Sequence, residues 1–403
     1  MKTTLKIKNV TIYLCVLGLI LFISCSKQEE PIKKWFKGNL HAHSYWSDGD
    51  DFPEMIMDWY KTNDYDFTVL SDHNTLNEGD KWITISSKEY LQQGFKKYLE
   101  KYGEDWVTHR LDSADNIQVK LKTYAEYEPL FKDDNFIMIP SEEVTTGFEG
   151  KPIHINATNI QKKITPVKGD TKVEVIQNNI DAILAQRAAL NVPILPHINH
   201  PNFGFALTAD DFVQLNNLHF FEVYNGHPAV FNEGDSTHLS TEQIWDIVNT
   251  AYAQQNKPLL YGIATDDSHH YHQFGKKYSN AGRGWVMVQS DSLKTSNIIS
   301  AMEAGNFYGS TGVVLDEINL EKDKLNIRVK SEPKVNYKIE FIGVSKTDKK
   351  PKIIKSVDGF EASLTLDDNY LFVRANVISD KTNKNFFDED EFEKAWVQPV
   401  LLK

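Results

Sequence analysis

The chain has 403 residues, of which 41% are hydrophobic and 25% are charged, and its formal net charge is −12 at pH 7. This composition is typical of a globular protein, and the length allows one large domain and a smaller one. A chain this acidic lacks the basic surface that nonspecific nucleic-acid binding requires, so we expect no nucleic-acid partner.

The N-terminal segment has the pattern of an export signal. Lysines, the last of them Lys8, precede an apolar run at residues 10–24, as in secretory signals. The run is shorter than the roughly 20 residues of a membrane-spanning helix. It is followed by Cys25 and resembles a bacterial lipoprotein signal, in which this cysteine becomes the lipidated first residue. We therefore predict a signal peptide at 1–24, a tether at 25–35 and a membrane-anchored lipoprotein that faces the periplasm or the cell surface. An uncleaved membrane anchor is the alternative.

Cysteine is confined to this segment, because Cys15 and Cys25 are the only two cysteines in the chain. The body of the protein therefore has no disulfide and no cysteine nucleophile. A metal site in the body must use His, Asp and Glu side chains.

The middle of the chain alternates between apolar segments that end in polar residues and segments with helical spacing. The expected strands are 35–43, 65–74, 135–143, 152–156, 192–200, 218–226 and 259–270. The expected helices are 53–63, 87–103, 173–191 and 240–256. The alternation favours parallel βα units, and in a βα barrel the active site lies at the carboxyl ends of the strands. An open doubly wound sheet is the alternative, although no Gly-rich phosphate loop follows any strand.

The pattern changes near residue 315. Short segments of alternating polarity, separated by turns, continue from there to the C-terminus. They predict a small antiparallel β domain at 315–403, in the form of a sandwich. This domain contains no histidine, so we expect it to serve packing or docking rather than chemistry.

The 13 histidines are placed unevenly, and several of them end the expected strands. His41 and His43 are two residues apart in a strand, so both imidazoles face the same side. Other candidate ligands at or just after strand ends are Asp48, His73, Glu143, His154, His197, His200, Asp266, Asp267, His269 and His270. A single histidine after a strand is usually an ordinary loop residue, as we expect for His109, His219 and His238. Because so many strand ends share this feature, we predict two or three divalent ions of Zn, Mn or Fe.

The ordered motifs resemble those of the PHP (polymerase and histidinol phosphatase) superfamily. They are HAHSYWSDG at 41–49, SDHN at 71–74, PSEEVT at 140–145, HIN at 154–156, PHINHP at 196–201 and DSH at 267–269. The resemblance implies a distorted (βα)7 TIM-like barrel over residues 36–314 with up to three metal ions. The segments 282–289 and 301–312, together with the β tail, are similar to a branch that contains carbaryl-type hydrolases.

The resemblance also implies a set of metal ligands. They are His41, His43, Glu143 and Asp267 for the first ion; Glu143, His154 and His197 for the second; and Asp48, His73 and His269 for the third. Several relatives have histidine at the position of Asp48, which leaves two or three ions open. Glu142 and Asp266 are the alternatives to Glu143 and Asp267, and the family spacings P-x-x-E and D-x-H favour the second residue of each pair.

Such a centre predicts hydrolysis without a side-chain nucleophile. Two neighbouring ions lower the pKa of a bridging water, so that a metal-bound hydroxide attacks at neutral pH. They also stabilise the negative charge that develops on a phosphoryl or carbonyl oxygen. Asp72, just before His73, is expected to orient an imidazole ligand through a hydrogen bond, without binding a metal ion itself.

Four further residues are candidates for the substrate side of the site. Arg283 could bind a substrate anion through its planar guanidinium group, or form an ordinary loop salt bridge. Three histidines could protonate a leaving group: His200 as a catalytic residue, and His227 and His270 on the substrate side. The segment around His227 could instead be a simple turn.

Taken together, these features predict a metal-dependent hydrolase of a small-molecule substrate, with phosphoesters as the first choice. A hydrolase of carbamate, ester or amide bonds with the same metal centre is the alternative. A third hypothesis, of another class, is a non-catalytic, metal-containing lipoprotein that binds a ligand for uptake.

Overall fold

The structure is a computed structural model that describes residues 33–383, 385 and 391–402. The predicted signal peptide, Cys25 and the tether up to Ile32 lie outside the described residues. From Lys33 onward the chain forms one compact unit. Among the described residues, no helix combines the length and the apolar character needed to cross a membrane.

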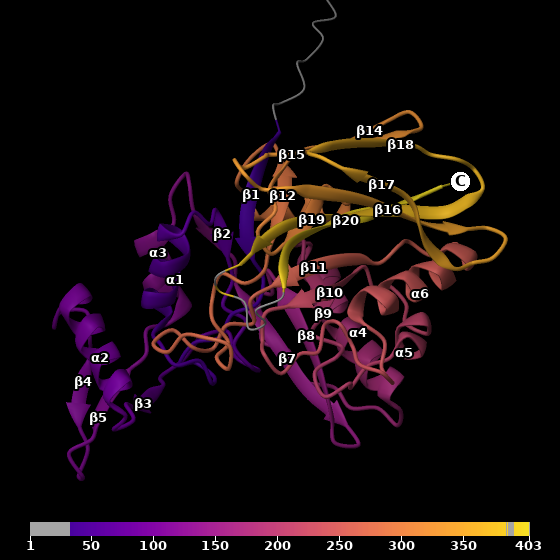
Figure 1. Cartoon of the computed structure of the whole chain (residues 1–403). Helices are drawn as coiled ribbons and strands as arrows, with labels where there is room; N and C mark the ends of the chain where they lie inside the picture. Colours follow the sequence, from indigo (N-terminus) through magenta and orange to yellow (C-terminus); the bar gives the residue numbers. More distant parts are fainter. Residues whose placement is uncertain (1–32, 384, 386–390, 403) are drawn as a thin grey trace, which may run out of the picture. The chain divides into compact units, whose positions relative to one another are not determined.

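A five-stranded sheet, magenta to salmon in Figure 1, has the order β11-β10-β9-β8-β7. Its strands are β7 (Ser141–Phe148), β8 (Lys151–Thr158), β9 (Leu195–Ile198), β10 (Phe220–Asn225) and β11 (Tyr261–Thr265). β9, β10 and β11 are parallel, whereas β8 is antiparallel to both of its neighbours. The β7–β8 connection is the pair Glu149–Gly150, and both residues have positive φ, as a tight hairpin turn requires.

Three helices pack on this sheet, on its right-hand side in Figure 1. They are α4 (Lys172–Leu190), α5 (Ala209–Val213) and α6 (Thr241–Gln254). The ends of two of them follow sequence signals. Thr171 caps α4 by accepting a hydrogen bond from a backbone N–H, and Asn191 ends it in the left-handed conformation. Ser240 caps α6 in the same way as Thr171.

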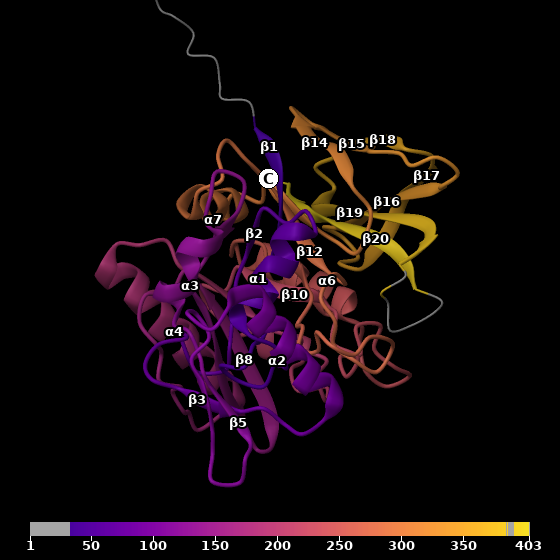
Figure 2. The ribbon, with the colours of Figure 1, turned by 90° about the vertical axis from the view of Figure 1, so that its left-hand side faces the viewer.

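A nine-stranded sheet has the order β17-β16-β19-β20-β13-β12-β1-β2-β6. Its strands are β1 (Lys34–Asn39), β2 (Phe67–Thr68), β6 (Ile137–Met138), β12 (Trp285–Ser290), β13 (Phe307–Ser310), β16 (Tyr337–Ser345), β17 (Pro351–Asp358), β19 (Tyr370–Thr382) and β20 (Phe392–Leu401). The helices α1 (Pro53–Thr62) and α3 (Tyr124–Phe131) contact each other and the β2–β6 end of this sheet, and α7 (Thr295–Glu303) contacts β12 (Figure 2). Pro53 occupies the first turn of α1, as expected from the sequence.

A small separate sheet lies in the segment that follows His73. It consists of β3 (Trp82–Thr84), β4 (His109–Leu111) and β5 (Ile117–Lys120), and α2 (Glu89–Tyr102) lies between β3 and β4 in the chain. His109 therefore belongs to this outlying sheet rather than to the two main sheets.

The strands do not close into the predicted barrel of parallel βα units. The tight β7–β8 turn makes these two strands antiparallel, and the paired strands belong to two separate sheets. Within the described residues, two isolated parallel bridges join the sheets, Ala42 to Ser268 and His73 to Glu143. Both bridges involve residues at or next to the predicted ligands, so the predicted metal site lies where the two sheets meet.

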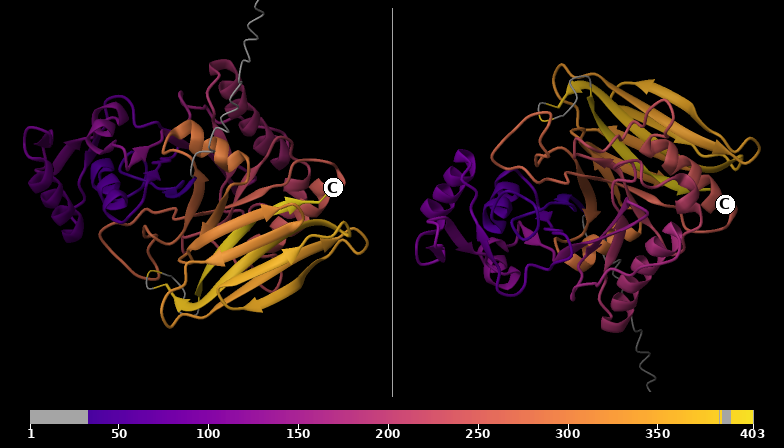
Figure 3. Two further views of the ribbon diagram at one scale, coloured as in Figure 1. Left: turned by 90° about the horizontal axis from the view of Figure 1, so that it is seen from above. Right: turned by 90° about the horizontal axis from the view of Figure 1, so that it is seen from below.

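The described residues from 315 onward form antiparallel strands. β14 (Leu315–Glu321), β15 (Lys324–Val329) and β18 (Glu361–Thr365) make a three-stranded sheet, whose apolar side chains share one core with β16, β19 and β20. These strands form the orange and yellow layer seen from above in Figure 3. β20 pairs with β13, so the nine-stranded sheet continues across the predicted boundary at residue 315. The fold is therefore a mixed α/β arrangement in which one sheet contains strands from both sides of residue 315.

Candidate metal centre

The centre begins just after β1, at the motif formed by His41 and His43. The intervening Ala42 and the preceding Leu40 belong to apolar core clusters, and both imidazoles are fully buried. His41 Nε2 and His43 Nε2 are 3.1 Å apart. Such a short distance is favourable when one ring donates a hydrogen bond to the other, or when both nitrogen lone pairs face a cation.

Glu143, in β7, lies at the middle of the cluster. Its carboxylate oxygens are 2.7–3.5 Å from ring nitrogens of five histidines, which are His41, His43, His73, His154 and His200. Asn199 Nδ2 donates a hydrogen bond of 2.7 Å to Oε1. The other oxygen, Oε2, is buried and accepts no hydrogen bond from the residues that the structure describes. A carboxylate in this position could bridge two ions.

Asp267, two residues beyond β11, faces the same imidazoles from the opposite sheet edge. Its Oδ1 is 3.2 Å from His41 Nε2 and 3.3 Å from His43 Nε2, and Asn225 Nδ2 donates a hydrogen bond of 3.0 Å to its Oδ2. Asp267 and His200 both have positive φ, at 49° and 21°. Asp and His adopt left-handed backbone more readily than most non-glycine residues, and this conformation directs both side chains at the turns that follow their strands.

A third group forms around Asp48, on the solvent side. Its carboxylate oxygens are 3.7, 3.5 and 3.4 Å from ring nitrogens of His43, His73 and His269. The His43 and His269 rings stack with their centroids 4.1 Å apart. The Asp48 side chain is 56% exposed, so a cation held by this group would be accessible from the cavity.

The residues present fit divalent metal ions. Five overlapping groups place one ligand atom of each member within 4.8 Å of the others. The groups are His43, Asp48, His73 and His269; His41, His43 and Asp267; His41, His197 and Glu222; His41, Glu143 and His200; and His73, Glu143 and His154. One buried oxygen of Glu143, Oε2, has no hydrogen-bond partner in the described chain. An unpaired buried carboxylate oxygen among imidazoles, with no thiol nearby, suits Zn, Mn or Fe.

Electrostatics hold His43 and the central carboxylates in metal-binding protonation states. Burial lowers the pKa of His43 to about 3, which keeps its ring neutral. Burial opposes ionisation of Glu143 and Asp267, but neighbouring histidines, His41 among them, lower the pKa of both carboxylates well below its usual range. Four histidines differ. Burial opposes the protonation of His41, His73, His200 and His269, yet nearby carboxylates raise the pKa of each ring. Glu143 and Asp48 raise the pKa of His73 to about 10. Metal binding at His73 must therefore displace a proton.

The structure separates the two histidines of the PHINHP motif. His197, expected at the second ion with Glu143, is in β9 and lies against Glu222 instead, with 3.5 Å between His197 Nε2 and Glu222 Oε1. His200 is 3.5 Å from Glu143, and its ring centroid is 5.0 Å from that of His154. The chain turns after β9, and the positive φ of His200 directs this ring to the cluster. His200 thus takes the place expected for His197.

Glu222, which the sequence analysis did not single out, is a buried acid in the apolar strand β10. His41 donates from Nδ1 to Glu222 Oε1 at 2.6 Å, which directs its Nε2 to the cluster. Glu222 also accepts hydrogen bonds from His200 N, Asn225 Nδ2 and Thr265 Oγ1 at 2.7, 2.8 and 2.9 Å. A glutamate in an otherwise apolar strand was the signal in the sequence that could have identified it.

The other acids near the motifs have supporting contacts. Asp72 accepts hydrogen bonds from Ser44 and Ser47. Ser47 Oγ is in turn 3.3 Å from His43 Nδ1. Asp72 is therefore connected to the predicted metal ligand His43 only through a serine. Glu142 accepts from the Ile164 backbone, outside the cluster.

Asp266 likewise points away from the centre and accepts hydrogen bonds from Tyr60 and from the backbone of Arg283. The structure therefore places the second residue of each acidic pair, Glu143 and Asp267, at the centre.

Arg283 does not occupy the predicted substrate position. Its side chain is buried and donates hydrogen bonds to the carbonyl oxygens of Gly226, Gly275 and Asn385. The guanidinium group therefore holds loops together inside the protein and does not line the cavity at the centre.

A cavity of about 420 Å³ opens onto the cluster. It is lined by Asp48, His73, Glu143, His154, His200, Phe203, His227, Asp267, His269 and His270. These lining residues include both predicted substrate-side histidines and no lysine or arginine. Lys151, at the start of β8, donates to the Gly204 carbonyl.

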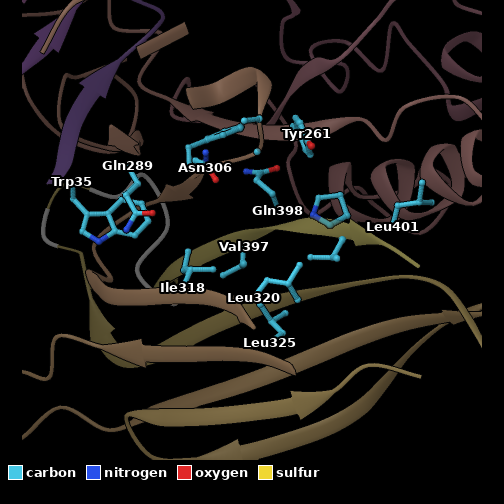
Figure 4. A pocket seen from close by; sticks show the side chains of 15 residues that line it. Trp35, Tyr261, Gln289, Asn306, Ile318, Leu320, Leu325, Val397, Gln398 and Leu401 are labelled. Carbon is cyan, nitrogen blue, oxygen red and sulfur yellow. The ribbon is translucent and has the colours of Figure 1, made fainter. Parts of the chain in front are cut away.

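A second cavity, of about 290 Å³, lies between β20 and the β12–α7 region and includes Trp35, Tyr261 and Gln398 (Figure 4). Its lining contains no histidine or acidic residue, so it offers no second metal site.

No protein-family model matches the chain, and no curated protein matches its sequence. A two-domain protein of Bacteroides vulgatus ATCC 8482, containing a predicted PHP-like metal-dependent phosphoesterase, has 13% identity and a TM-score of 0.40, with 91% of this chain and 95% of that one covered. A protein of Bifidobacterium adolescentis ATCC 15703, assigned as a metal-dependent phosphoesterase, has 12% identity and a TM-score of 0.29, with 59% and 88% covered. An amidohydrolase of Chromobacterium violaceum, with bound sulfate and no metal, has 11% identity and a TM-score of 0.31, with 67% and 96% covered.

Proposed function

We propose that this protein is a metal-dependent hydrolase of the PHP type, and that its substrate is a phosphoester. The observation that carries the proposal is the position of Glu143, whose carboxylate lies within 2.7–3.5 Å of five imidazoles at the base of an open cavity. A structural role alone does not account for so many buried titratable groups around one carboxylate.

The side chains would divide the work as follows. His41, His43, Asp267 and Glu143 would hold one ion, Glu143 with His154 and His200 a second, and Asp48, His73 and His269 a third. Bound divalent ions supply a water of lowered pKa as the nucleophile and stabilise the charge that develops on the substrate oxygen. Glu222 fixes the His41 tautomer, and Asn199 and Asn225 orient the two central carboxylates.

Charge balance favours an anionic substrate. Three divalent ions would carry more positive charge than the negative charge of the four acidic groups Asp48, Glu143, Glu222 and Asp267. Bound ions would thus reverse the sign of the field at the cavity, despite the acidity of the chain as a whole. A phosphoester then needs no lysine or arginine from the lining.

A second candidate is the hydrolysis of a carbamate or carboxylic ester with the same centre. The lining favours this alternative because it has no cationic side chain besides the histidines, and because Phe203 gives it an apolar wall.

The test combines metal analysis with a substrate panel. We expect purified protein from Cys25 onward, without the signal, to carry at least one equivalent of Zn, Mn or Fe and to hydrolyse aryl phosphomonoesters or phosphodiesters. Turnover of aryl carbamates or esters alone would select the second candidate. Metal without any turnover would support the ligand-binding lipoprotein, and less than one equivalent of metal would refute the proposed centre.

We also propose that the protein is exported and anchored to a membrane through a lipid on Cys25, facing the periplasm or the cell surface. The support is the positive and apolar N-terminal pattern that ends at this cysteine. Metabolic labelling with a radioactive fatty acid tests the anchor directly.

A further inference from the structure

Two histidines of the cavity wall belong to neither the proposed metal ligands nor the apolar core. His227 follows β10 and His270 follows β11, and both are partly buried and line the cavity of about 420 Å³. The His227 ring lies 5.5 Å from that of the proposed ligand His269, centroid to centroid.

Backbone hydrogen bonds determine the tautomer of both rings. The backbone N–H of Ala229 donates to His227 Nδ1 at 3.1 Å, and that of Ser279 donates to His270 Nδ1 at 3.2 Å. A backbone amide can only donate, so each Nδ1 must present a lone pair, and the proton of the neutral ring must be on Nε2. No hydrogen bond joins either Nε2–H to another residue in the part of the chain that the structure describes.

Arg283 connects the two loops that carry these rings. Its Nη1 donates to the carbonyl of Gly226, the residue before His227, at 2.9 Å. Its Nη2 is 3.4 Å from Asn280 Oδ1, and Asn280 Nδ2 donates to the His270 carbonyl at 2.7 Å. One buried guanidinium group therefore links the backbones of the two loops that carry these imidazoles.

We propose that His227 and His270 form a pair of neutral hydrogen-bond donors that hold an oxygen atom of the substrate through their Nε2–H groups. This inference rests on the proposed hydrolase function, because the substrate's reacting group must lie at the metal cluster of the same cavity. Fixed N–H donors stabilise negative charge on a phosphoryl or acyl oxygen, as in an oxyanion hole, without adding a charge of their own. They explain how a cavity without lysine or arginine in its lining could orient a polar substrate.

The tautomers can be observed without any substrate. In zinc-loaded protein labelled with ¹⁵N-histidine, we expect NMR signals of His227 and His270 with Nε2 protonated and Nδ1 unprotonated. The single variants His227→Ala and His270→Ala assign the two signals. Protonation of Nδ1 in either ring would overturn the proposal.

Ligand binding and kinetics test the donor role itself. For His227→Ala and His270→Ala we expect unchanged metal content, together with a loss of about tenfold or more in kcat/KM and in affinity for inorganic phosphate. Because the donors are neutral, the pH profile should keep its shape, and His227→Gln, which retains an N–H donor, should recover part of the loss. The control His109→Ala, in the outlying small sheet, should match the wild type.

The outcomes separate this inference from the proposed function. A wild-type protein without metal or turnover would contradict the hydrolase proposal, although the NMR result could still stand. An active wild type with alanine variants of normal kcat/KM and phosphate affinity would overturn the donor pair alone. Loss of the basic limb of the pH profile in either variant would also overturn it, because that result identifies a proton-donating acid.

Discussion

Replacing Glu222 by Gln changes one atom of a buried side chain and should disrupt the support of the metal centre. Glu222 accepts four hydrogen bonds: Oε1 from His41 Nδ1 and Thr265 Oγ1, and Oε2 from His200 N and Asn225 Nδ2. In either orientation, the glutamine NH₂ group would face two of these donors. Leaving a buried donor unpaired costs about 1–3 kcal/mol. Loss of a residue that accepts a hydrogen bond from a ligand histidine typically weakens metal affinity roughly 10–100-fold.

We therefore expect Glu222→Gln to weaken metal binding roughly 10–100-fold, which corresponds to about 1.4–2.8 kcal/mol. A competition titration of the metal-free protein with a chromophoric chelator measures this affinity. Glu142→Gln is the matched control, because Glu142 is also buried but bonds to the Ile164 backbone outside the cluster. Wild-type affinity in Glu222→Gln, or an equal loss in the control, would refute the assigned role of Glu222.

Three further predictions concern the second metal position, the packing of the C-terminal strands and the anchor. His200→Ala should remove metal and activity together. His197→Ala should mainly lower the melting temperature, and metal analysis with calorimetry separates the two results. Burial opposes ionisation of Glu242, but Lys394 and a neighbouring arginine lower its pKa below 4.5. Its stabilising contribution is therefore complete above pH 4.5 and is lost as the pH falls through the lower, folded-state pKa. The melting temperatures of wild type and Glu242→Gln should thus differ at pH 7 and converge in acid. Cys25→Ser should release the protein from the membrane fraction, as an immunoblot of cell fractions would show.

The candidate site was largely predictable because ligand chemistry is local. His41 and His43 alternate along a strand, and each further motif places its acid or imidazole at or near a strand end. Chain topology brings such positions together whether or not the strands close into a barrel. The absence of thiols from the body likewise restricts the ligand types without any knowledge of the fold. The prediction of export is likewise local, because it depends only on the lysines, the apolar run and the cysteine of the N-terminal segment.

Tertiary structure decided what depends on direction and on distant partners. The sequence alone does not distinguish the roles of His197 and His200. Only the turn after β9 determines which ring reaches Glu143. Arg283 resembles an anion-binding residue in the sequence, yet three backbone carbonyls from separate segments accept its hydrogen bonds. The β7–β8 pair is antiparallel and departs from the predicted parallel βα units, because a two-residue turn cannot join parallel strands. Local pattern thus determined which chemistry is available, and the packing of remote segments determined which side chains carry it.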